Sequence, residues 1–169
     1  MKCIWTIREE IFPTEKQKQK ILQTLGCCRF VYNYMLSRNR KAYRRRKANV
    51  MSRYEMQNLL PKLKQVYPWL KDADSQALQH SCQRLSEAYN RFFKTKKGYP
   101  KFRSRKYPVQ SYTTNGLYNR HITKQTIQLP LLGKGSVGIK TGCRFREGFS
   151  HYPLRKRPIF CIYRGGRRT

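Results

Sequence analysis

The segment from Phe92 to Asn115 combines dense positive charge with aromatic rings. Its sequence is FFKTKKGYPKFRSRKYPVQSYTTN, and between Lys94 and Lys106 more than half of the residues are Lys or Arg and none is acidic. The interspersed rings are Phe92, Phe93, Tyr99, Phe102, Tyr107 and Tyr112. Cations bind phosphates, and aromatic faces stack on unpaired bases, each stacked base contributing about 1 to 3 kcal/mol. This pattern favours a nucleic-acid ligand over the alternative, a solvated lysine-rich loop whose rings are packed inside.

The chain as a whole carries a strong positive charge. Its 169 residues include 38 basic and 8 acidic ones, which gives a formal net charge of +30 and a pI near 10.5. A field of this size attracts polyanions over a Debye length of about 8 to 10 Å. An anionic membrane would require a basic helix with a strong apolar face, whereas the basic runs here adjoin Gly, Pro and Tyr. We therefore expect a nucleic-acid partner and no membrane partner.

The amino-terminal residues and the cysteines point away from secretion and metal binding. The segment MKCIWTIREE lacks the apolar core of a signal peptide, and no run approaches the roughly 18 apolar residues of a membrane span, so a cytoplasmic location is predicted. Six cysteines occur at positions 3, 27, 28, 82, 143 and 161 without a Cys-x-x-Cys pair, and the histidines are isolated. We expect reduced thiols, with Cys27 and Cys82 as small buried hydrophobes, and neither a metal nor a cofactor.

Alternating polarity predicts a strand over residues 3–11. After it, Thr14 and Gln17 have the spacing of a capping box, which predicts a helix from this point to Gly26. A second helix is expected to begin near Cys27, with an apolar stripe that faces the core.

The second predicted helix ends in a dense basic run. Seven of the ten residues from Arg38 to Lys47 are Lys or Arg, which is more than solvation requires. We interpret the run as a phosphate contact, with a solvated helix face as the alternative. Its candidate contacts are Arg44, Arg45 and Arg46.

Two further helices are predicted in the first hundred residues. Ser52 and Glu55 have capping-box spacing, and Pro61 is expected to bend or interrupt the helix that they open. The fourth helix begins after Asp72 or Asp74, either of which can cap it. Its apolar seam comprises Leu78, Cys82, Leu85, Tyr89 and Phe92, at intervals of 4, 3, 4 and 3 residues.

Beyond Gly98 the pattern becomes extended. Short strands are predicted at 111–114, 126–129 and 137–140, and the first strand can pair with them in a small barrel or sheet. The predicted division is 1–12 for the first strand, 13–97 for a helical, helix-turn-helix-like lobe, 98–142 for the basic loop and remaining strands, and 143–169 for a divergent tail.

Five segments of the chain form a characteristic series. They are the first strand ending in Phe12-Pro13-Thr14, GCCRFVYNYML from Gly26, WLKDADSQALQ from Trp69, NRFFKTKKGYPKFRSRK from Asn90 and QSYTTN from Gln110. In order and separation they resemble the amino-terminal part of TnpB, the transposon-encoded protein also called the OrfB-type transposase. A weaker match, IQLPLLGKGSVGIK, begins at Ile127, so the resemblance covers roughly residues 1 to 142.

Members of the TnpB family are RNA-guided DNA endonucleases, similar to type V CRISPR effectors. The resemblance implies an α+β fold, in which a small barrel-like wedge domain is interrupted by a helical recognition lobe of about four helices. It also implies guide RNA and double-stranded DNA as partners. Together with Lys97 of the basic segment, the expected contacts are Ser75, Gln76, Gln79, Tyr99, Lys101, Phe102, Arg103, Lys106, Ser111, Tyr112, Thr113, Thr114 and Asn115.

The nuclease part of the family has no counterpart in this sequence. Family members cut DNA with a RuvC-like domain that has three metal-binding carboxylates and is accompanied by a zinc ribbon. Two-metal cleavage needs several carboxylates around cations about 4 Å apart, but only Glu87 and Glu147 follow Asp74. We therefore expect no catalytic residue, no metal ligand and no enzymatic activity, as in a truncated or frameshifted reading frame.

Two other functions are compatible with the composition. A basic RNA-binding structural protein of the ribosomal type has similar length and charge, although the uncharged polar residues Gln76, Gln79 and Gln83 favour a shaped site. An independent enzyme would need a base such as His80 or His121, and neither is accompanied by a nucleophile or a carboxylate cluster. The sequence therefore predicts the nucleic-acid-binding amino-terminal portion of a TnpB-type transposase from an insertion sequence.

Overall fold

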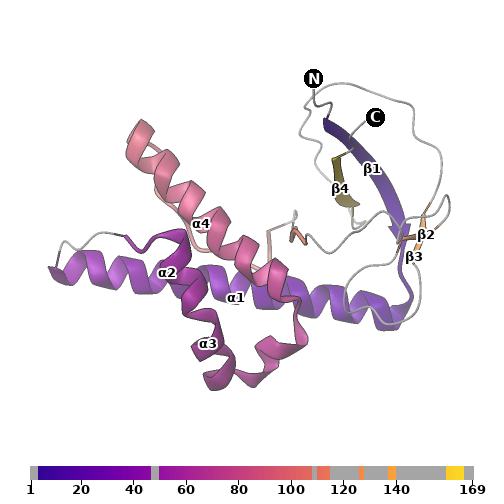
Figure 1. Cartoon of the computed structure of the whole chain (residues 1–169), viewed down its shortest axis with the longest axis horizontal. Helices are drawn as coiled ribbons and strands as arrows, with labels where there is room; N and C mark the ends of the chain where they lie inside the picture. Colours follow the sequence, from indigo (N-terminus) through magenta and orange to yellow (C-terminus); the bar gives the residue numbers. More distant parts are fainter. Residues whose placement is uncertain are drawn as a thin grey trace.

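The computed structural model describes residues 4–46, 50–107 and 110–114, together with strands at 126–127, 137–139 and 159–165. Its elements are β1 (Ile4–Phe12), α1 (Glu15–Arg46), α2 (Arg53–Asn58), α3 (Leu60–Val66), the 3-10 helix η1 (Pro68–Asp72), α4 (Ser75–Thr95), β2 (Thr126–Ile127), β3 (Val137–Ile139) and β4 (Ile159–Gly165). In Figure 1, α4 crosses α1, with α2 and α3 beside them, and the strands lie beyond the start of α1.

The predicted α+β fold with a barrel-like wedge domain is wrong. The part of the chain whose side chains are described (13–44, 50–107 and 110–114) is helical and contains no strand. Among the described residues, four strands form a sheet in the order β2-β3-β1-β4, in which β2 and β4 are the edges, whereas a barrel has none. β2 and β3 have two and three residues, and strands this short offer too few ladder hydrogen bonds to close a barrel.

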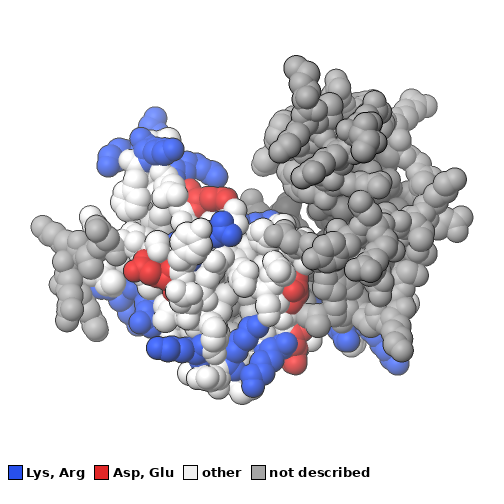
Figure 2. Space-filling view, in the orientation of Figure 1, with Lys and Arg blue, Asp and Glu red and all other residues white. Residues whose placement is uncertain are grey.

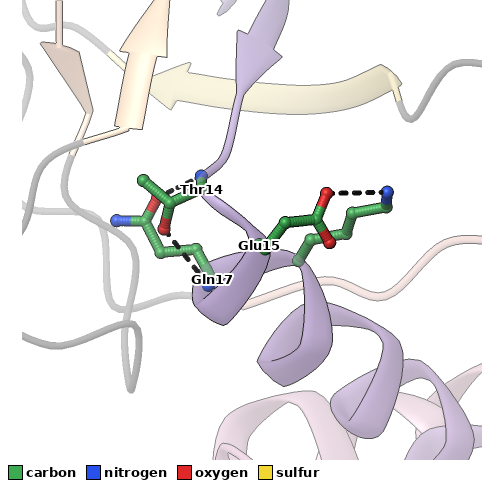
Figure 3. Close-up of polar contacts among 4 residues, drawn as sticks. Thr14, Glu15 and Gln17 are labelled. Carbon is green, nitrogen blue, oxygen red and sulfur yellow. Dashed lines mark hydrogen bonds and ion pairs between the residues drawn. The ribbon is translucent and has the colours of Figure 1, made fainter.

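Helix α1 runs without the break that was predicted at Gly26. It spans 32 residues, and its start matches the prediction: Thr14 N donates to Gln17 Oε1 at 2.9 Å and Gln17 N donates to Thr14 Oγ1 at 3.4 Å (Figure 3). A helical glycine costs about 1 kcal/mol relative to alanine. The neighbouring Cys27 and Cys28 are buried in the core, and we attribute the continuity of the helix to this packing.

The predictions for the α2–α3 region are confirmed. Ser52 N donates to Glu55 Oε2 at 2.6 Å, and Glu55 N donates to Ser52 Oγ at 3.3 Å, which completes the capping box of α2. The helix ends at Asn58, and α3 carries Pro61 in its first turn, where the missing N–H breaks no helical bond.

Helix α4 packs its predicted seam against α1. Asp74 caps it, since Gln76 N donates to Asp74 Oδ1 at 3.1 Å. The helix ends at Lys96, whose φ of 54° is left-handed and whose N–H bonds to Phe92 O. The core between the helices consists of Cys27, Cys28, Val31, Tyr32, Met35, Leu36, Met56, Leu60, Leu63, Leu70, Ala73, Ala77, Leu78, Cys82, Leu85 and Tyr89.

Candidate nucleic-acid interface

Residues Lys96 to Tyr107, which we call the basic loop, are anchored on α1 by one side chain. Asn33 Nδ2 donates to Arg103 O at 2.9 Å, and Arg103 N donates to Asn33 Oδ1 at 2.8 Å. The amide therefore satisfies both backbone groups of Arg103, as a neighbouring strand would. Because buried or half-buried backbone groups need partners, this clamp holds an otherwise irregular segment in place.

Cation–π contacts join the basic loop to the basic half of α1. The Arg40 guanidinium lies 5.7 Å from the ring centroid of Tyr99 and 5.4 Å from that of Phe102. The Arg103 guanidinium lies 3.9 Å from the ring centroid of Tyr32. Two basic segments that are more than fifty residues apart in the sequence thus meet, while the Arg103 side chain is partly occupied by a contact inside the protein.

The basic loop nevertheless presents most of its predicted contacts to solvent. Lys97, Lys101 and Lys106 are exposed. Phe102 and Tyr107 are 51% and 65% exposed, so the alternative that these rings are packed inside does not hold for them. The third ring, of Tyr99, is 37% exposed, and its hydroxyl lies 3.4 Å from that of Tyr89.

Residues 110–114 are tied to α4 by two charged side chains. Arg84 donates to Ser111 O and Ser111 Oγ at 3.1 Å and to Thr113 Oγ1 at 2.8 Å. Thr114 Oγ1 donates to Asp74 Oδ2, so the residue that caps α4 also holds this segment. Burial is the main cause that raises the pKa of Tyr112 to about 12, and its side chain packs against the core.

The α4 candidates lie on the exposed side of that helix. Ser75, Gln76 and Gln79 are all exposed, and Lys64 Nζ donates to Ser75 Oγ at 2.7 Å. Asp74 connects this end of α4 to Thr114, whereas Ser111 and Thr113 bond Arg84, further along the same helix. Among the remaining candidates, Arg44 is exposed in the last turns of α1. Three groups of predicted residues lie outside the described part: Asn115, the side chains of Arg45 and Arg46, and residues 143–158 and 166–169 of the predicted tail.

Sequence reasoning missed several residues that build this region. Asn33 and Arg40 hold the basic loop, Arg84 holds residues 110–114, and Arg29 Nη1 donates to Gln110 Oε1 at 3.1 Å. Asn33 could have been recognised from the sequence, because it is a polar residue between Tyr32 and Tyr34 in a predicted apolar stripe and therefore needs a hydrogen-bond partner. No local signal distinguishes the arginines, because exposed arginines are common on helices and their partners are far away in the sequence.

The surface of the described residues has little negative charge to offset its cations. In Figure 2, Lys and Arg gather over the outer end of α4 and over α3, with a largely uncharged area between them. One ion pair is present among the residues whose side chains are described, Lys18 with Glu15 at 3.2 Å. Among the same residues, no three His, Cys, Asp or Glu side chains are grouped as metal ligands.

The cysteines whose side chains are described, Cys27, Cys28 and Cys82, are buried thiols. Burial raises the pKa of Cys28 to about 11 and that of Cys82 to about 12, and it also raises the pKa of Cys27. The prediction that Cys27 and Cys82 serve as small buried hydrophobes is confirmed. None of the helices in the described part of the chain has the length and apolar character needed to cross a membrane.

Comparisons with known proteins agree with the resemblance. The helix-turn-helix domain of OrfB proteins from IS605-type elements matches residues 1–48. The chain is 32% identical over 108 residues to "Putative RNA-guided DNA endonuclease InsQ" of Escherichia coli, covering 62% of this chain and 26% of that protein. It is 31% identical over 98 residues to "Putative RNA-guided DNA endonuclease" of Streptomyces pristinaespiralis, covering 56% of this chain and 24% of that protein.

A third relative is matched over most of its length. "Virulence protein VsdF" of Salmonella dublin is 32% identical over 103 residues, covering 55% of this chain and 87% of that protein. The chain belongs to the OrfB/TnpB family. It spans about a quarter of the two endonuclease relatives. Within the OrfB domain match, the described residues form β1 and the single helix α1.

Proposed function

We propose that this OrfB/TnpB chain is the nucleic-acid-binding amino-terminal portion of a transposase from an insertion sequence. In this proposal its basic surface holds double-stranded DNA and a guide RNA in the cytoplasm. The observation that carries the proposal is the contact of Arg40 with the rings of the basic loop, because it unites the two basic segments in one surface. Two relatives that are named RNA-guided DNA endonucleases support the choice of ligands.

The electrostatics of the basic loop support phosphate binding. Lys97, Lys101, Arg105 and Lys106 are exposed, and the loop contains no acidic residue. A cluster of cations without counter-charges is destabilised by mutual repulsion, which a polyanion relieves. The clamp from Asn33 fixes the loop before any ligand arrives, so little ordering entropy is lost on binding.

The salt dependence of binding tests this surface. Each phosphate that a protein neutralises contributes about 0.7 to 0.9 to the slope of log affinity against log salt. The triple variant Lys97→Gln, Lys101→Gln, Lys106→Gln should reduce that slope by about 2 to 3 for duplex DNA. The matched control is Lys16→Gln, Lys62→Gln, Lys71→Gln, which removes the same charge from exposed positions elsewhere.

Each outcome of this comparison is decisive. A slope near zero for the unmodified chain would contradict nucleic-acid binding through charge. An equal loss of slope in both triple variants would show that the basic loop is not the binding surface. A loss confined to the first variant would support the proposal.

The guide RNA has its own test. The chain can be crosslinked in cells and the attached RNA sequenced. If the chain binds a guide, one RNA species should be strongly enriched over its share of total RNA, and charge-only binding would return a profile that mirrors total RNA. A profile that mirrors total RNA would contradict binding of a specific guide RNA, but it would still be compatible with general nucleic-acid binding.

We also propose that the chain does not cut DNA by itself. Every acidic residue whose side chain the structure describes (within 13–44, 50–107 and 110–114) has a structural partner: Glu15 bonds Lys18, Glu55 bonds Ser52, Asp72 bonds Gln23, Asp74 bonds Gln76 and Thr114, and Glu87 bonds Gln83. Magnesium-dependent cleavage that Glu87→Ala or Glu147→Ala abolishes would contradict this proposal. Activity that survives both substitutions would indicate a contaminating nuclease.

A further inference from the structure

A positively charged pocket of about 390 Å³ lies between the first half of α1, the middle of α4 and residues of the segments 101–107 and 110–111. Arg29, Arg84, Lys101 and Arg103 contribute to its wall, and none of its lining residues is acidic. Ligand pockets range from about 300 to 1,000 Å³. This one therefore has room for a single small group and cannot admit a duplex.

The charge in the pocket is not neutralised within the described residues. Arg84 is half-buried, and its hydrogen bonds go to the uncharged acceptors of Ser111 and Thr113. Burial and then the charge of Arg103 lower the pKa of Arg84, while Cys28 and Glu87 act weakly in the opposite direction. An anion placed in the pocket would offset both the burial and the repulsion.

Two rings at the pocket add a second kind of contact. Phe102 and Tyr107 both line it and are both more than half exposed. Exposed rings beside cations match the features of nucleotide-binding surfaces, in which the base stacks and the phosphate is neutralised. A bare phosphate would use the arginines and leave the rings without a role.

The walls of the pocket are held by hydrogen bonds between distant segments. Gln110 accepts from Arg29 and donates through Nε2 to Arg105 O at 2.6 Å. The amide of Asn33 fixes Arg103 from the side of α1. The pocket is thus built from contacts that already exist in the protein without a ligand.

We propose that this pocket binds one unpaired nucleotide of a nucleic-acid strand, with its phosphate at Arg29 and Arg84 and its base against Phe102 or Tyr107. The base must be unpaired because the faces of a paired base are covered by its neighbours in the duplex. The inference rests on the proposed function and adds a preference for single-stranded over duplex segments at this place.

The test compares a fluorescein-labelled single strand of twelve thymidines with a twelve-base-pair duplex, using the full chain and fluorescence anisotropy. Tyr107→Ala should weaken single-strand binding roughly tenfold and duplex binding less than twofold. Phe102→Ala should weaken single-strand binding by a similar factor and should also reduce duplex binding, because the Phe102 ring contacts Arg40. Tyr54→Ala is the matched control, since Tyr54 is 72% exposed on α2, away from the pocket. It should change neither affinity.

Competition separates a nucleotide from a simple anion. Thymidine 5′-monophosphate should displace the labelled strand more effectively than inorganic phosphate, and Phe102→Ala should abolish this difference. Equal competition by inorganic phosphate in the unmodified chain would overturn the nucleotide site. Arg29→Gln should weaken binding of both competitors.

The failure of this inference can be told apart from failure of the proposed function. If pocket variants leave single-strand binding unchanged while duplex binding remains salt-dependent, the pocket proposal is overturned and the basic surface stands. If Tyr107→Ala weakens single-strand and duplex binding equally, the preference for an unpaired nucleotide is also overturned. If neither nucleic acid binds, both proposals are overturned.

Discussion

Helix α1 serves two regions of the molecule in different ways. Toward α4 it presents side chains such as Val31 and Met35, which are completely buried against the α4 seam. Toward the basic loop it presents Asn33 and Arg40, which make two hydrogen bonds and cation–π contacts. The first contact excludes water along its length, while the second leaves most of the loop exposed.

The two regions therefore contribute to different properties: the α1–α4 seam to stability, and the contact with the basic loop to ligand binding. Apolar burial contributes about 25 cal/mol per Å², so the buried seam between α1 and α4 stabilises the helical unit strongly. The contact with the basic loop adds less stability than the seam does, but it holds the cations of the loop at fixed positions. Substitutions in the seam should therefore change unfolding, and substitutions at the loop contact should change ligand binding.

The largest effect is expected in the seam. Leu85 is fully buried on α4, and Leu85→Ala should lower the free energy of unfolding by about 2 to 5 kcal/mol, because it removes apolar contact and leaves a cavity. Urea denaturation followed by circular dichroism measures this change. Leu22→Ala is the control: Leu22 is 58% exposed on α1 and should cost less than about 0.5 kcal/mol. Equal losses of unfolding free energy in Leu85→Ala and Leu22→Ala would contradict the distinction between the buried seam and the exposed surface of the helices.

An intermediate effect is expected at the loop contact. Asn33→Ala removes both bonds to the backbone of Arg103, and neutral hydrogen bonds contribute about 0.5 to 1.5 kcal/mol each. Amide hydrogen exchange at Arg103 should become faster, and affinity for duplex DNA should fall several-fold because the cations lose their fixed positions. Asn90→Ala, an exposed substitution on α4, should do neither. Unchanged exchange at Arg103 would contradict the clamp.

Local sequence signals predicted the helix starts correctly, apart from the break expected at Gly26. The two capping boxes, the interruption at Pro61 and the Asp74 cap involve residues within three or four positions of one another. The α4 seam followed from helical periodicity. Its positions are spaced as one helical face requires, and the first four are buried as predicted.

Features that depend on distant partners were not predictable in this way. Asn33 and Arg103 are 70 positions apart, and Arg84 and Ser111 are 27 apart. The sheet depends on pairing of β1 with β4, which lie at opposite ends of the chain. The basic and aromatic residues of the loop were predictable as a group, but their geometry depends on these contacts.

The error at Gly26 leads to a smaller stability test. Gly26 lies inside α1, and a Cβ built there meets no atom within 4 Å. Gly26→Ala should therefore stabilise the protein by about 0.5 to 1 kcal/mol. Thermal unfolding measures the change, and Gly98→Ala is the contrasting variant, because Gly98 has φ +73° and its substitution should destabilise. If Gly26→Ala destabilised the protein, this would contradict the position of Gly26 inside a continuous helix α1.

The smallest effect concerns a polar contact that, unlike the Asn33 clamp, is exposed and can be titrated. The hydrogen bond from the Ser52 backbone N–H, and then that from its side chain, hold the pKa of Glu55 below its usual value of 4.5. Because the folded-state pKa is lowered, the contribution to stability is present above about pH 4.5 and is lost as the pH falls through the folded-state pKa. Titration by nuclear magnetic resonance should show this. Ser52→Ala should return the pKa only part of the way, since the backbone donor remains. If the pKa of Glu55 returned fully to its usual value in Ser52→Ala, the Ser52 hydroxyl and not its backbone N–H would be the cause of the shift.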